Sequence, residues 1–317
     1  MEENKLSVVI PIYNEQDCMF ELYNQLVLEL DKISDNYEII FVNDGSTDNS
    51  EKTLNSLVER NSKVRLINFR KNFGQTAALS AGFNSCHGDL VVSLDSDLQN
   101  DPRDIGKMID KLRNESLDVV CGWRAKRNDS ISKKILSKLA NSIRKIVTGN
   151  HLHDSGCTLR VYKKNALDNL ELFGEMHRFI PDILVWQGFK VGEVVTNHRA
   201  RQHGKTKYSL TRIIKGILDL FLLKFWMDYA RRPIHLFGGF GILLLFLGFL
   251  LGVYLTIAKF FYSIPLSNRP LLFLVILLIL SGFQLVIFGV LADIMIRSYY
   301  NKDNKPYYLI KNIKNDR

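Results

Sequence analysis

Residues 90–99 read LVVSLDSDLQ, an apolar run that ends in two carboxylates, Asp95 and Asp97. The run predicts a strand buried in a parallel sheet, and open α/β sheets bind ligands at the carboxyl ends of such strands. Side chains alternate along extended backbone, so both carboxylates are expected to point the same way. Two hard oxygen ligands suit Mg²⁺ or Mn²⁺ shared with a diphosphate, and Gln99 adds a third polar group on that side. The alternative is a structural cap, because D-x-D also occurs on solvated loops.

The surrounding sequence alternates between apolar, β-branched runs and helix-length segments. The expected strands are Leu6–Ile10, Glu38–Val42, Val64–Phe69, Leu90–Leu94 and Asp118–Cys121. The expected helices lie near Gln16–Ile33, Thr47–Arg60, Gln75–Cys86 and Pro102–Asn114, the last with Asp101 as its N-cap. Strands separated by helix-length connections predict a mainly parallel sheet covered on both faces. The polar part of the chain, about 230 residues, is long enough for one large α/β domain.

Two stretches near the carboxyl end, Ile234–Ala258 and Pro270–Ala292, contain no charged residue. Each exceeds the roughly 20 apolar residues that span the hydrocarbon core of a bilayer. We therefore expect two transmembrane helices, 233–258 and 270–296, joined by an external loop, 259–269. A pair of buried core helices is the alternative, and two uncharged runs of this length make it the weaker one.

Lysine and arginine in the flanks of these stretches predict their orientation. Arg231 and Arg232 precede the first stretch, and the basic tail 297–317 follows the second, whereas the loop carries only Lys259 and Arg269. The prediction is an integral protein of the cytoplasmic membrane, with both termini and the polar domain in the cytoplasm. The opening MEENKLSVVIP does not resemble a signal peptide.

The net charge of +9 is concentrated in two segments of the chain. Residues 122–145 carry eight Lys and Arg against Asp129, and residues 199–232 carry nine against Asp219 and Asp228. Such segments are attracted to anionic lipid surfaces. Nucleic-acid binding is the rival explanation for a basic protein, and the apolar hairpin disfavours it. Residues 209–232 are expected to form a juxtamembrane amphipathic helix, with an ordinary helix packed on the polar domain as the alternative.

Other polar residues follow the first two expected strands, which end in VVIPIYNEQ and IIFVNDGSTD. Asp44, at the end of the second, has the chemistry to accept hydrogen bonds from a base or a ribose, and a structural role is equally compatible with its position. Asp48 is better explained as a cap of the following helix. Four cysteines without CxxC spacing indicate neither a zinc site nor a disulfide framework.

A longer series of motifs occurs in order from about residue 6 to residue 296. It comprises VVIPIYNE, VNDGSTD, NFGQ, SLDSDLQNDP, GWR, HDSGCTLR, HRF and RQHGKTKYS, followed by the two apolar stretches. With this series the chain resembles the inverting glycosyltransferases of family 2, which have the GT-A fold. The closest resemblance is to the branch that transfers a sugar from a nucleotide to polyprenyl phosphate, which includes dolichol-phosphate mannose synthases and GtrB-like enzymes. It implies a Rossmann-like GT-A catalytic domain over residues 1–208.

The resemblance also implies site residues. The nucleotide pocket would be lined by Pro11, Tyr13, Glu15 and Asp44, and the metal and diphosphate would be held by Asp95, Asp97 and Gln99. The anion-binding set would place Arg201 and Lys205 over the donor diphosphate, and Arg124 and Arg199 at the acceptor phosphate. Arginine suits this task because its planar fork matches phosphate oxygens. Asp154 would act with Asp97 in catalysis, either as a base or as an orienter of the acceptor.

The expected function is inverting, metal-dependent transfer of one sugar from a nucleotide sugar to undecaprenyl or another polyprenyl phosphate, giving a lipid-linked sugar for cell-envelope glycosylation. No QxxRW string of the processive family members is present, which favours a single transfer. UDP-glucose is the first donor we expect, and the GtrB-like relatives suggest a homo-oligomer such as a tetramer. The alternatives are a glycan or glycerolipid acceptor, or a non-catalytic membrane scaffold that binds nucleotide.

Overall fold

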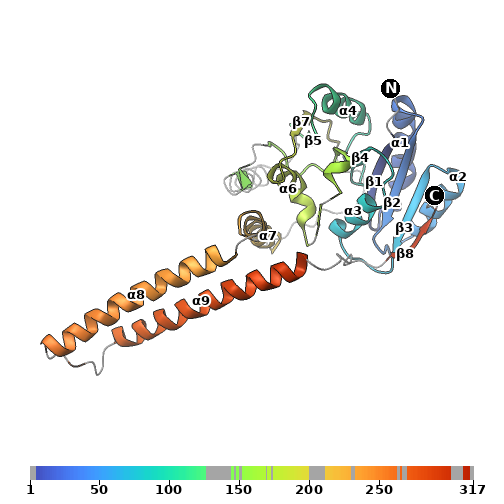
Figure 1. Cartoon of the computed structure of the whole chain (residues 1–317). Helices are drawn as coiled ribbons and strands as arrows, with labels where there is room; N and C mark the ends of the chain where they lie inside the picture. The colour runs from blue at the N-terminus through green and yellow to red at the C-terminus, as the bar shows by residue number, and fades with distance from the viewer. Residues whose placement is uncertain are drawn as a thin grey trace. The chain divides into compact units, whose positions relative to one another are not determined.

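A computed structural model of the chain divides into two compact units. The first comprises the chain up to Leu220 together with Pro306–Arg317, and the second is Phe221–Lys305. Figure 1 shows the elements of both units. The structure describes residues 5–125, 144–145, 148–149, 152–168, 170–172, 174–199, 211–229, 233–262, 265, 270–300 and 310–314.

The first unit is built on an eight-stranded sheet with the order β7-β5-β6-β4-β1-β2-β3-β8. Its strands are β1 (Leu6–Ile12), β2 (Tyr37–Asn43), β3 (Val64–Phe69), β4 (Leu90–Ser93), β5 (Val119–Trp123), β6 (Arg160–Lys163), β7 (Val191–Val195) and β8 (Ile310–Lys314). Neighbouring strands from β4 to β3 run parallel, as do β5 and β7. β6 is antiparallel to both β4 and β5, and β8 is antiparallel to β3. The expected α/β fold class and all five expected strands are confirmed.

Three strands, β6, β7 and β8, were not predicted from the sequence. β6 is only four residues long and contains Arg160 and Lys163, so it lacks an apolar run. β7 contains Gly192 and Glu193, and β8 lies in the segment that was expected to be a basic tail. β8 returns the chain to the sheet after the two apolar helices, and its register pairs Leu66 with Lys314.

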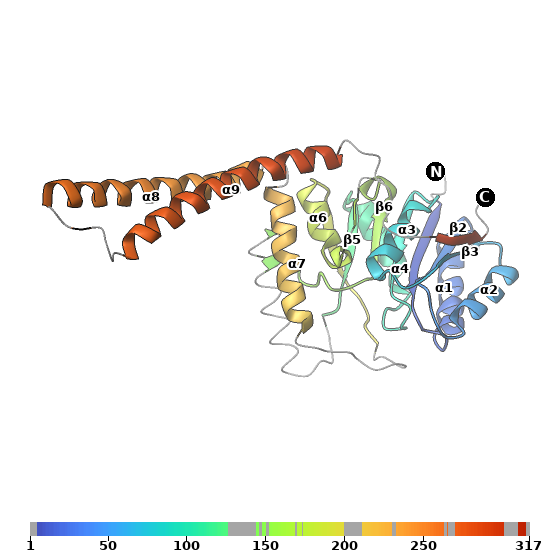
Figure 2. The same ribbon diagram turned by 90° about the horizontal axis from the view of Figure 1, so that it is seen from below.

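Helices cover both faces of the sheet (Figure 2). They are α1 (Met19–Ile33), α2 (Ser50–Arg60), α3 (Gln75–Asn84), α4 (Asp104–Asn114) and α6 (Ile180–Trp186), with 3₁₀ turns at Lys164–Ala166 and Met176–Phe179. Alternate residues of β1 and β2 share a buried cluster with α1, α2 and α4. The intervening residues, such as Val9 and Val42, lie against α3, where a Cβ at Gly82 would meet a Val9 methyl at 2.2 Å. Because helices cover both faces of β1 and β2, every residue of these two strands is buried.

The start of α4 differs from the expectation. The helix begins at Asp104, and residues 102–103 form a turn in which the Asp101 carbonyl accepts the Asp104 N–H at 3.0 Å. The Asp101 carboxylate accepts the Arg103 backbone N–H at 3.2 Å and also binds the Arg103 guanidinium, so it bonds to the turn that leads into the helix.

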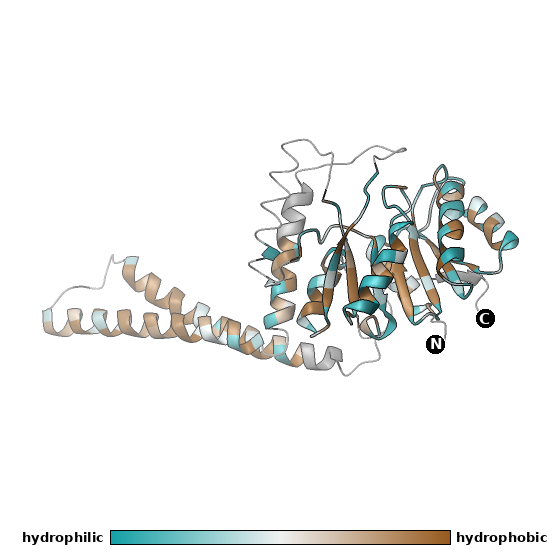
Figure 3. Ribbon diagram, turned by 90° about the horizontal axis from the view of Figure 1, so that it is seen from above, coloured by the Kyte–Doolittle hydropathy of each residue, from teal (hydrophilic) through white to brown (hydrophobic). Residues whose placement is uncertain are grey.

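The second unit contains the two long apolar helices, α8 (Pro233–Tyr262) and α9 (Pro270–Tyr300). By length and composition, Pro233–Tyr262 and Pro270–Met295 are candidate membrane spans, with mean hydropathies of 2.5 and 2.9. Only 17% and 11% of their most apolar windows are buried, so these helices are not the core of a soluble domain. Figure 3 shows hydrophobic residues along most of both helices.

Glycines bring α8 and α9 close together. A Cβ at Gly241 would lie 2.7 Å from the Gly282 carbonyl oxygen, and one at Gly282 would lie 2.8 Å from the Gly241 carbonyl oxygen. The two backbones thus touch where neither residue has a side chain, as is common between membrane helices. By contrast, a Cβ at Gly239 would meet nothing within 4 Å.

α7 (Thr211–Asp228) corresponds to the helix expected over residues 209–232. Three of its large apolar side chains are exposed, namely Leu218, Phe221 and Leu222, whereas Leu220 and Leu223 are buried. The exposed residues are three and four apart and so share one face of the helix.

Candidate active site

A pocket of about 270 Å³ opens at the carboxyl ends of the central strands. Its walls come from the segments that follow β1, β2 and β4, together with the turn before α3. The lining residues are Pro11, Ile12, Tyr13, Glu15, Asp44, Asn72, Gly74, Gln75, Asp95, Ser96 and Asp97. Six of the residues expected from the sequence therefore lie around one cavity, because parallel strands bring their carboxyl ends to the same edge.

Asp44, at the end of β2, is held by the turn before α3. Its carboxylate accepts backbone N–H groups from Phe73 at 2.7 Å and Gly74 at 2.9 Å, and the Asn72 side-chain amide at 2.9 Å. Burial raises the pKa of Asp44, and the two backbone donors oppose that rise. Asp44 therefore fixes this wall of the pocket, which supports the structural role left open by the sequence, and it also faces the cavity.

Gly45 makes this close approach possible. Its φ of +66° lies in the left-handed region, and a Cβ there would be 2.4 Å from the Lys71 carbonyl carbon. Any other residue would be strained in conformation and would collide with backbone. Gly45 is thus required for the chain to pass Lys71 and Asn72 at this distance.

Asp95 and Asp97 follow β4 and line the same pocket. Gln75, the first residue of α3, donates its side-chain amide to Asp95 Oδ1 at 2.7 Å. Burial, followed by the charge of Asp97, raises the pKa of Asp95 to about 6. Leu98, which follows Asp97 directly, has a φ of +61°, and this is a strained conformation for a buried leucine. Such strain is typical of segments that fix the direction of functional side chains.

The donor set fits a hard divalent cation. No group of three or more His, Cys, Asp or Glu side chains is arranged as a metal site in the part of the chain that the structure describes. Asp95 and Asp97 therefore supply at most two protein carboxylates. Mg²⁺ and Mn²⁺ are commonly bound by one or two carboxylates, with phosphate and water oxygens completing the shell. A cation would also neutralise the repulsion that raises the pKa of Asp95.

Gln99 does not line the pocket. Its backbone N–H donates to Asp97 Oδ1 at 3.2 Å, and its carbonyl accepts the Arg199 N–H at 2.9 Å. Gln99 is thus linked to the predicted metal ligands through its backbone.

Asp154 and Arg124 form a two-bond ion pair. Arg124 Nε donates to Asp154 Oδ2 at 2.6 Å, and Nη2 donates to Oδ1 at 2.8 Å. The Arg124 backbone N–H adds a third bond at 3.2 Å, and both side chains are largely buried. Burial lowers the pKa of Arg124, but the hydrogen bonds and charge of Asp154 raise it above the usual value. The charges of Arg124 and Asp95 also act on each other, so this pair lies within electrostatic range of the carboxylate pair.

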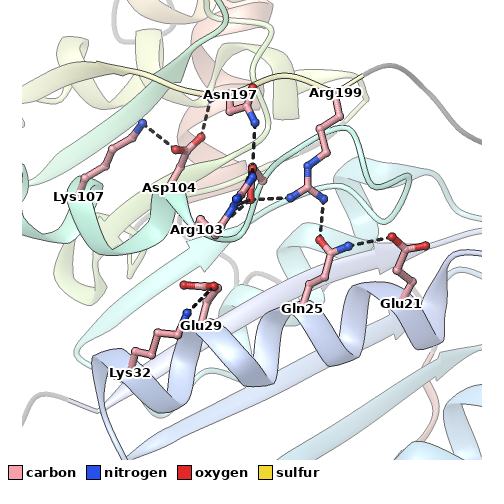
Figure 4. Close-up of polar contacts among 10 residues, drawn as sticks. Glu21, Gln25, Glu29, Lys32, Arg103, Asp104, Lys107, Asn197 and Arg199 are labelled. Carbon is pink, nitrogen blue, oxygen red and sulfur yellow. Dashed lines mark hydrogen bonds and ion pairs between the residues drawn. The ribbon is translucent and has the colours of Figure 1, made fainter.

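Arg199 is engaged away from the pocket (Figure 4). Its Nη2 lies 2.8 Å from Asp101 Oδ1, and its Nη1 donates to Gln25 of α1 at 2.7 Å. Asp101 also accepts the side-chain amide of Asn197. The contact of Arg199 with an acceptor phosphate stays a prediction. Arg201 and Lys205, expected over the donor diphosphate, lie outside the described residues.

Five residues of the pocket had no role assigned from the sequence, and three of these come from the turn before α3 and its first residue. Asn72, Gly74 and Gln75 bind the carboxylates of Asp44 and Asp95. The NFGQ motif after the third strand was the available signal, since it also follows a strand at the carboxyl edge of the sheet.

The sheet order, with the Asp95–Asp97 pair directly after β4 at the carboxyl edge, agrees with the GT-A fold expected from the sequence. The model of the family "Glycosyl transferase family 2" matches residues 7–171. The chain belongs to this family and is a glycosyltransferase.

Relatives of the whole chain carry names from the polyprenyl-phosphate branch. A dodecaprenyl-phosphate galacturonate synthase from Rhizobium johnstonii is 38% identical over 98% of this chain and 94% of the relative. An undecaprenyl-phosphate 4-deoxy-4-formamido-L-arabinose transferase from Proteus mirabilis is 33% identical over 98% and 94%. The resemblance to this branch is thus confirmed.

Solved structures share the fold. A glucosyl-3-phosphoglycerate synthase from Mycobacterium tuberculosis, in complex with Mn²⁺, UDP and glucosyl-3-phosphoglycerate, has a TM-score of 0.56. It covers 70% of this chain and 80% of its own at 18% identity. The same enzyme with phosphoglyceric acid gives a TM-score of 0.55 at 17% identity, covering 71% and 80%. At these identities the likeness shows the fold alone.

Proposed function

We propose that this glycosyltransferase moves one sugar from a UDP-sugar to a polyprenyl phosphate, with inversion at the anomeric carbon and with Mg²⁺ or Mn²⁺. The observation that carries the proposal is the single pocket that joins Tyr13 and Asp44 to Asp95 and Asp97. In this pocket the nucleotide would lie against Tyr13 and Asp44, and its diphosphate would lie beside Asp95 and Asp97. The names of the relatives, which contain dodecaprenyl phosphate and undecaprenyl phosphate, support the acceptor.

The most specific part of the proposal is the identity of the donor sugar. UDP-glucose remains the first candidate. Galacturonate and 4-deoxy-4-formamido-L-arabinose join it because the relatives' names contain these sugars. Their UDP-linked forms belong in the same donor panel, since the choice between similar sugars depends on the shape of the pocket.

The mechanism assigns separate tasks to the carboxylates and to the ion pair. Asp95 and Asp97 would hold the cation, which neutralises charge on the leaving nucleoside diphosphate. Gln75 and the backbone of Gln99 keep these carboxylates in place. The acceptor phosphate is already an anion at neutral pH and needs no strong base to attack the anomeric carbon.

Asp154 is better suited to orient than to remove a proton. Both of its oxygens accept hydrogen bonds from Arg124, so the carboxylate already holds that guanidinium. We assign it the task of holding Arg124, whose guanidinium would then contact the acceptor phosphate. Replacing Arg124 by lysine would lose the two-pronged contact with Asp154.

The membrane arrangement is proposed from four observations. α8 and α9 are long enough to form two spans, and an even number of spans returns the chain to the same side. The pairing of β8 with β3 supports this return, because residues on either side of the hairpin share one sheet. The exposed apolar face of α7 supports an interfacial helix at an anionic surface, and the basic flanks support a cytoplasmic catalytic domain.

The test uses the full chain purified in detergent, with Mn²⁺ or Mg²⁺, undecaprenyl phosphate and a panel of UDP- and GDP-sugars. The expected product is an undecaprenyl monophosphate sugar, identified by mass, with the α or β configuration opposite to that of the donor. Retention of configuration would contradict the inverting mechanism. Binding of UDP without turnover on any donor would favour the scaffold, and transfer to a glycerolipid or glycan alone would replace the acceptor.

A further inference from the structure

Glu193, in the middle of β7, contacts the loop that carries Asp154. Its Oε1 accepts the backbone N–H groups of His153 at 2.7 Å and of Asp154 at 3.1 Å. Its Oε2 lies 2.9 Å from the His153 backbone nitrogen and 2.8 Å from Nδ1 of the His153 ring. The side chain is only 12% exposed. One carboxylate thus binds two consecutive peptide groups and one side chain of this loop.

The sheet brings Glu193 and Arg124 to the same short segment. β5 and β7 run parallel with Cys121 paired to Glu193, and Arg124 follows β5 directly. Arg124 binds the carboxylate of Asp154, and Glu193 binds its backbone N–H. Asp154 is therefore held at both its main chain and its side chain by two neighbouring strands.

His153 is fixed in the same way. Its ring stacks on Trp123, the last residue of β5, with the ring centroids 4.3 Å apart and the planes inclined by 18°. Trp123 covers a face of the His153 ring, and Glu193 contacts its edge at Nδ1. Because Trp123 adjoins Arg124, these contacts also tie the loop to the residue that forms the ion pair.

We propose that Glu193 is a positioning residue that sets the place of Asp154, and through it of Arg124, for catalysis. This inference rests on the role proposed above for Asp154. Glu193 does not line the nucleotide pocket, so it has no direct part in donor binding. Its removal should therefore lower kcat and leave the KM for the donor and the affinity for UDP unchanged. A displacement of about 1 Å at a reacting group can cost up to about a hundredfold in rate.

The experiment compares Glu193→Ala and Glu193→Gln in the full chain, using undecaprenyl phosphate and the UDP-sugar that supports transfer in the panel above. We expect Glu193→Ala to lower kcat by about ten- to a hundredfold. Glu193→Gln should restore part of it, because its side-chain oxygen still accepts the two backbone N–H groups. Glu115→Gln, at an exposed carboxylate after α4, is the matched control and should behave like the unaltered protein.

A double-mutant cycle with Asp154→Asn separates positioning from a merely structural role. Residual turnover is measured with enzyme in excess. If Glu193 acts through Asp154, Glu193→Ala has little further effect in the Asp154→Asn background. An equal loss in both backgrounds, an unchanged kcat, or a fall in Tm together with weaker UDP binding would overturn the inference.

The same variants distinguish failure of this inference from failure of the proposed function. Full turnover by Asp154→Asn would remove the role of Asp154 and with it the basis for Glu193. Lost turnover by Asp154→Asn combined with unchanged turnover by Glu193→Ala would remove only the positioning role.

Discussion

The side-chain amide of Gln75 donates a 2.7 Å hydrogen bond to Oδ1 of Asp95, which joins the first turn of α3 to the end of β4. A hydrogen bond of this kind orients a metal-binding carboxylate from outside the coordination shell. Such partners typically contribute ten- to a hundredfold to metal affinity. Gln75 is therefore as informative a target as the carboxylates themselves.

Replacing Gln75 by alanine should weaken Mn²⁺ binding by about tenfold without unfolding the protein, because Asp95 loses the group that orients it. The measurement is the Mn²⁺ concentration that gives half-maximal transfer. Gln187→Ala, at an exposed position after α6, serves as the control. Equal Mn²⁺ requirements for Gln75→Ala and the unaltered protein would contradict the assignment of Asp95 as a ligand.

Asp97→Ala should reduce transfer by at least about a thousandfold, since it removes one of two protein carboxylates from the cation. Thermal unfolding and membrane association should be unchanged. Chelation by EDTA should have the same effect on the unaltered protein, with activity restored by Mn²⁺ or Mg²⁺. Asp110→Asn, on the exposed side of α4, provides the matched control. Substantial transfer by Asp97→Ala would show that these residues do not form the metal site.

Metal affinity should fall as the pH decreases below about 6. Burial and the charge of Asp97 raise the pKa of Asp95 to about 6 in the protein without metal. Below that pH the carboxyl group is protonated and a cation must displace the proton, so the apparent affinity declines by up to about tenfold per pH unit. Above it the affinity should be nearly constant. Mn²⁺ titrations between pH 5 and 8 check this, and a flat profile would contradict it.

Gly241→Leu should destabilise the α8–α9 hairpin by about 1–3 kcal/mol, because its Cβ would lie 2.7 Å from the Gly282 carbonyl oxygen. Gly239→Leu is the control, since a Cβ there has open space. Thermal unfolding in detergent and cross-linking between cysteines introduced into the two helices would measure the difference. Similar behaviour of the two variants would mean that the helices do not pack through Gly241.

Structure could be predicted from the sequence where one continuous segment has a clear pattern of apolar and charged residues. The DSD pair predicted the position of the pocket because an apolar strand leads directly into it. The two uncharged stretches likewise predicted α8 and α9. In each case the pattern depends on neighbours in the chain and not on distant contacts.

Distant partners explain what could not be predicted. The bonds of Arg199 to Asp101 and Gln25 could not be predicted, because both partners are far away in the sequence. The contacts of Glu193 could not be predicted, because it lies in a short strand with no apolar run and its partners are 39 and 40 positions away. β6 was missed for the same reason, since four residues with charged ends carry too little pattern.

The pairing of β8 with β3 has a practical consequence for anyone who wishes to study the catalytic domain in water. Cutting the chain before α8 would also discard Ile310–Lys314, and the outer hydrogen-bonding groups of β3 would lose their partners. An uncovered strand edge is a template for association with other molecules. A soluble version is therefore better made by excising residues 233–305 and joining the two remaining pieces through a flexible linker. The edge strand would then stay attached to the domain that it completes.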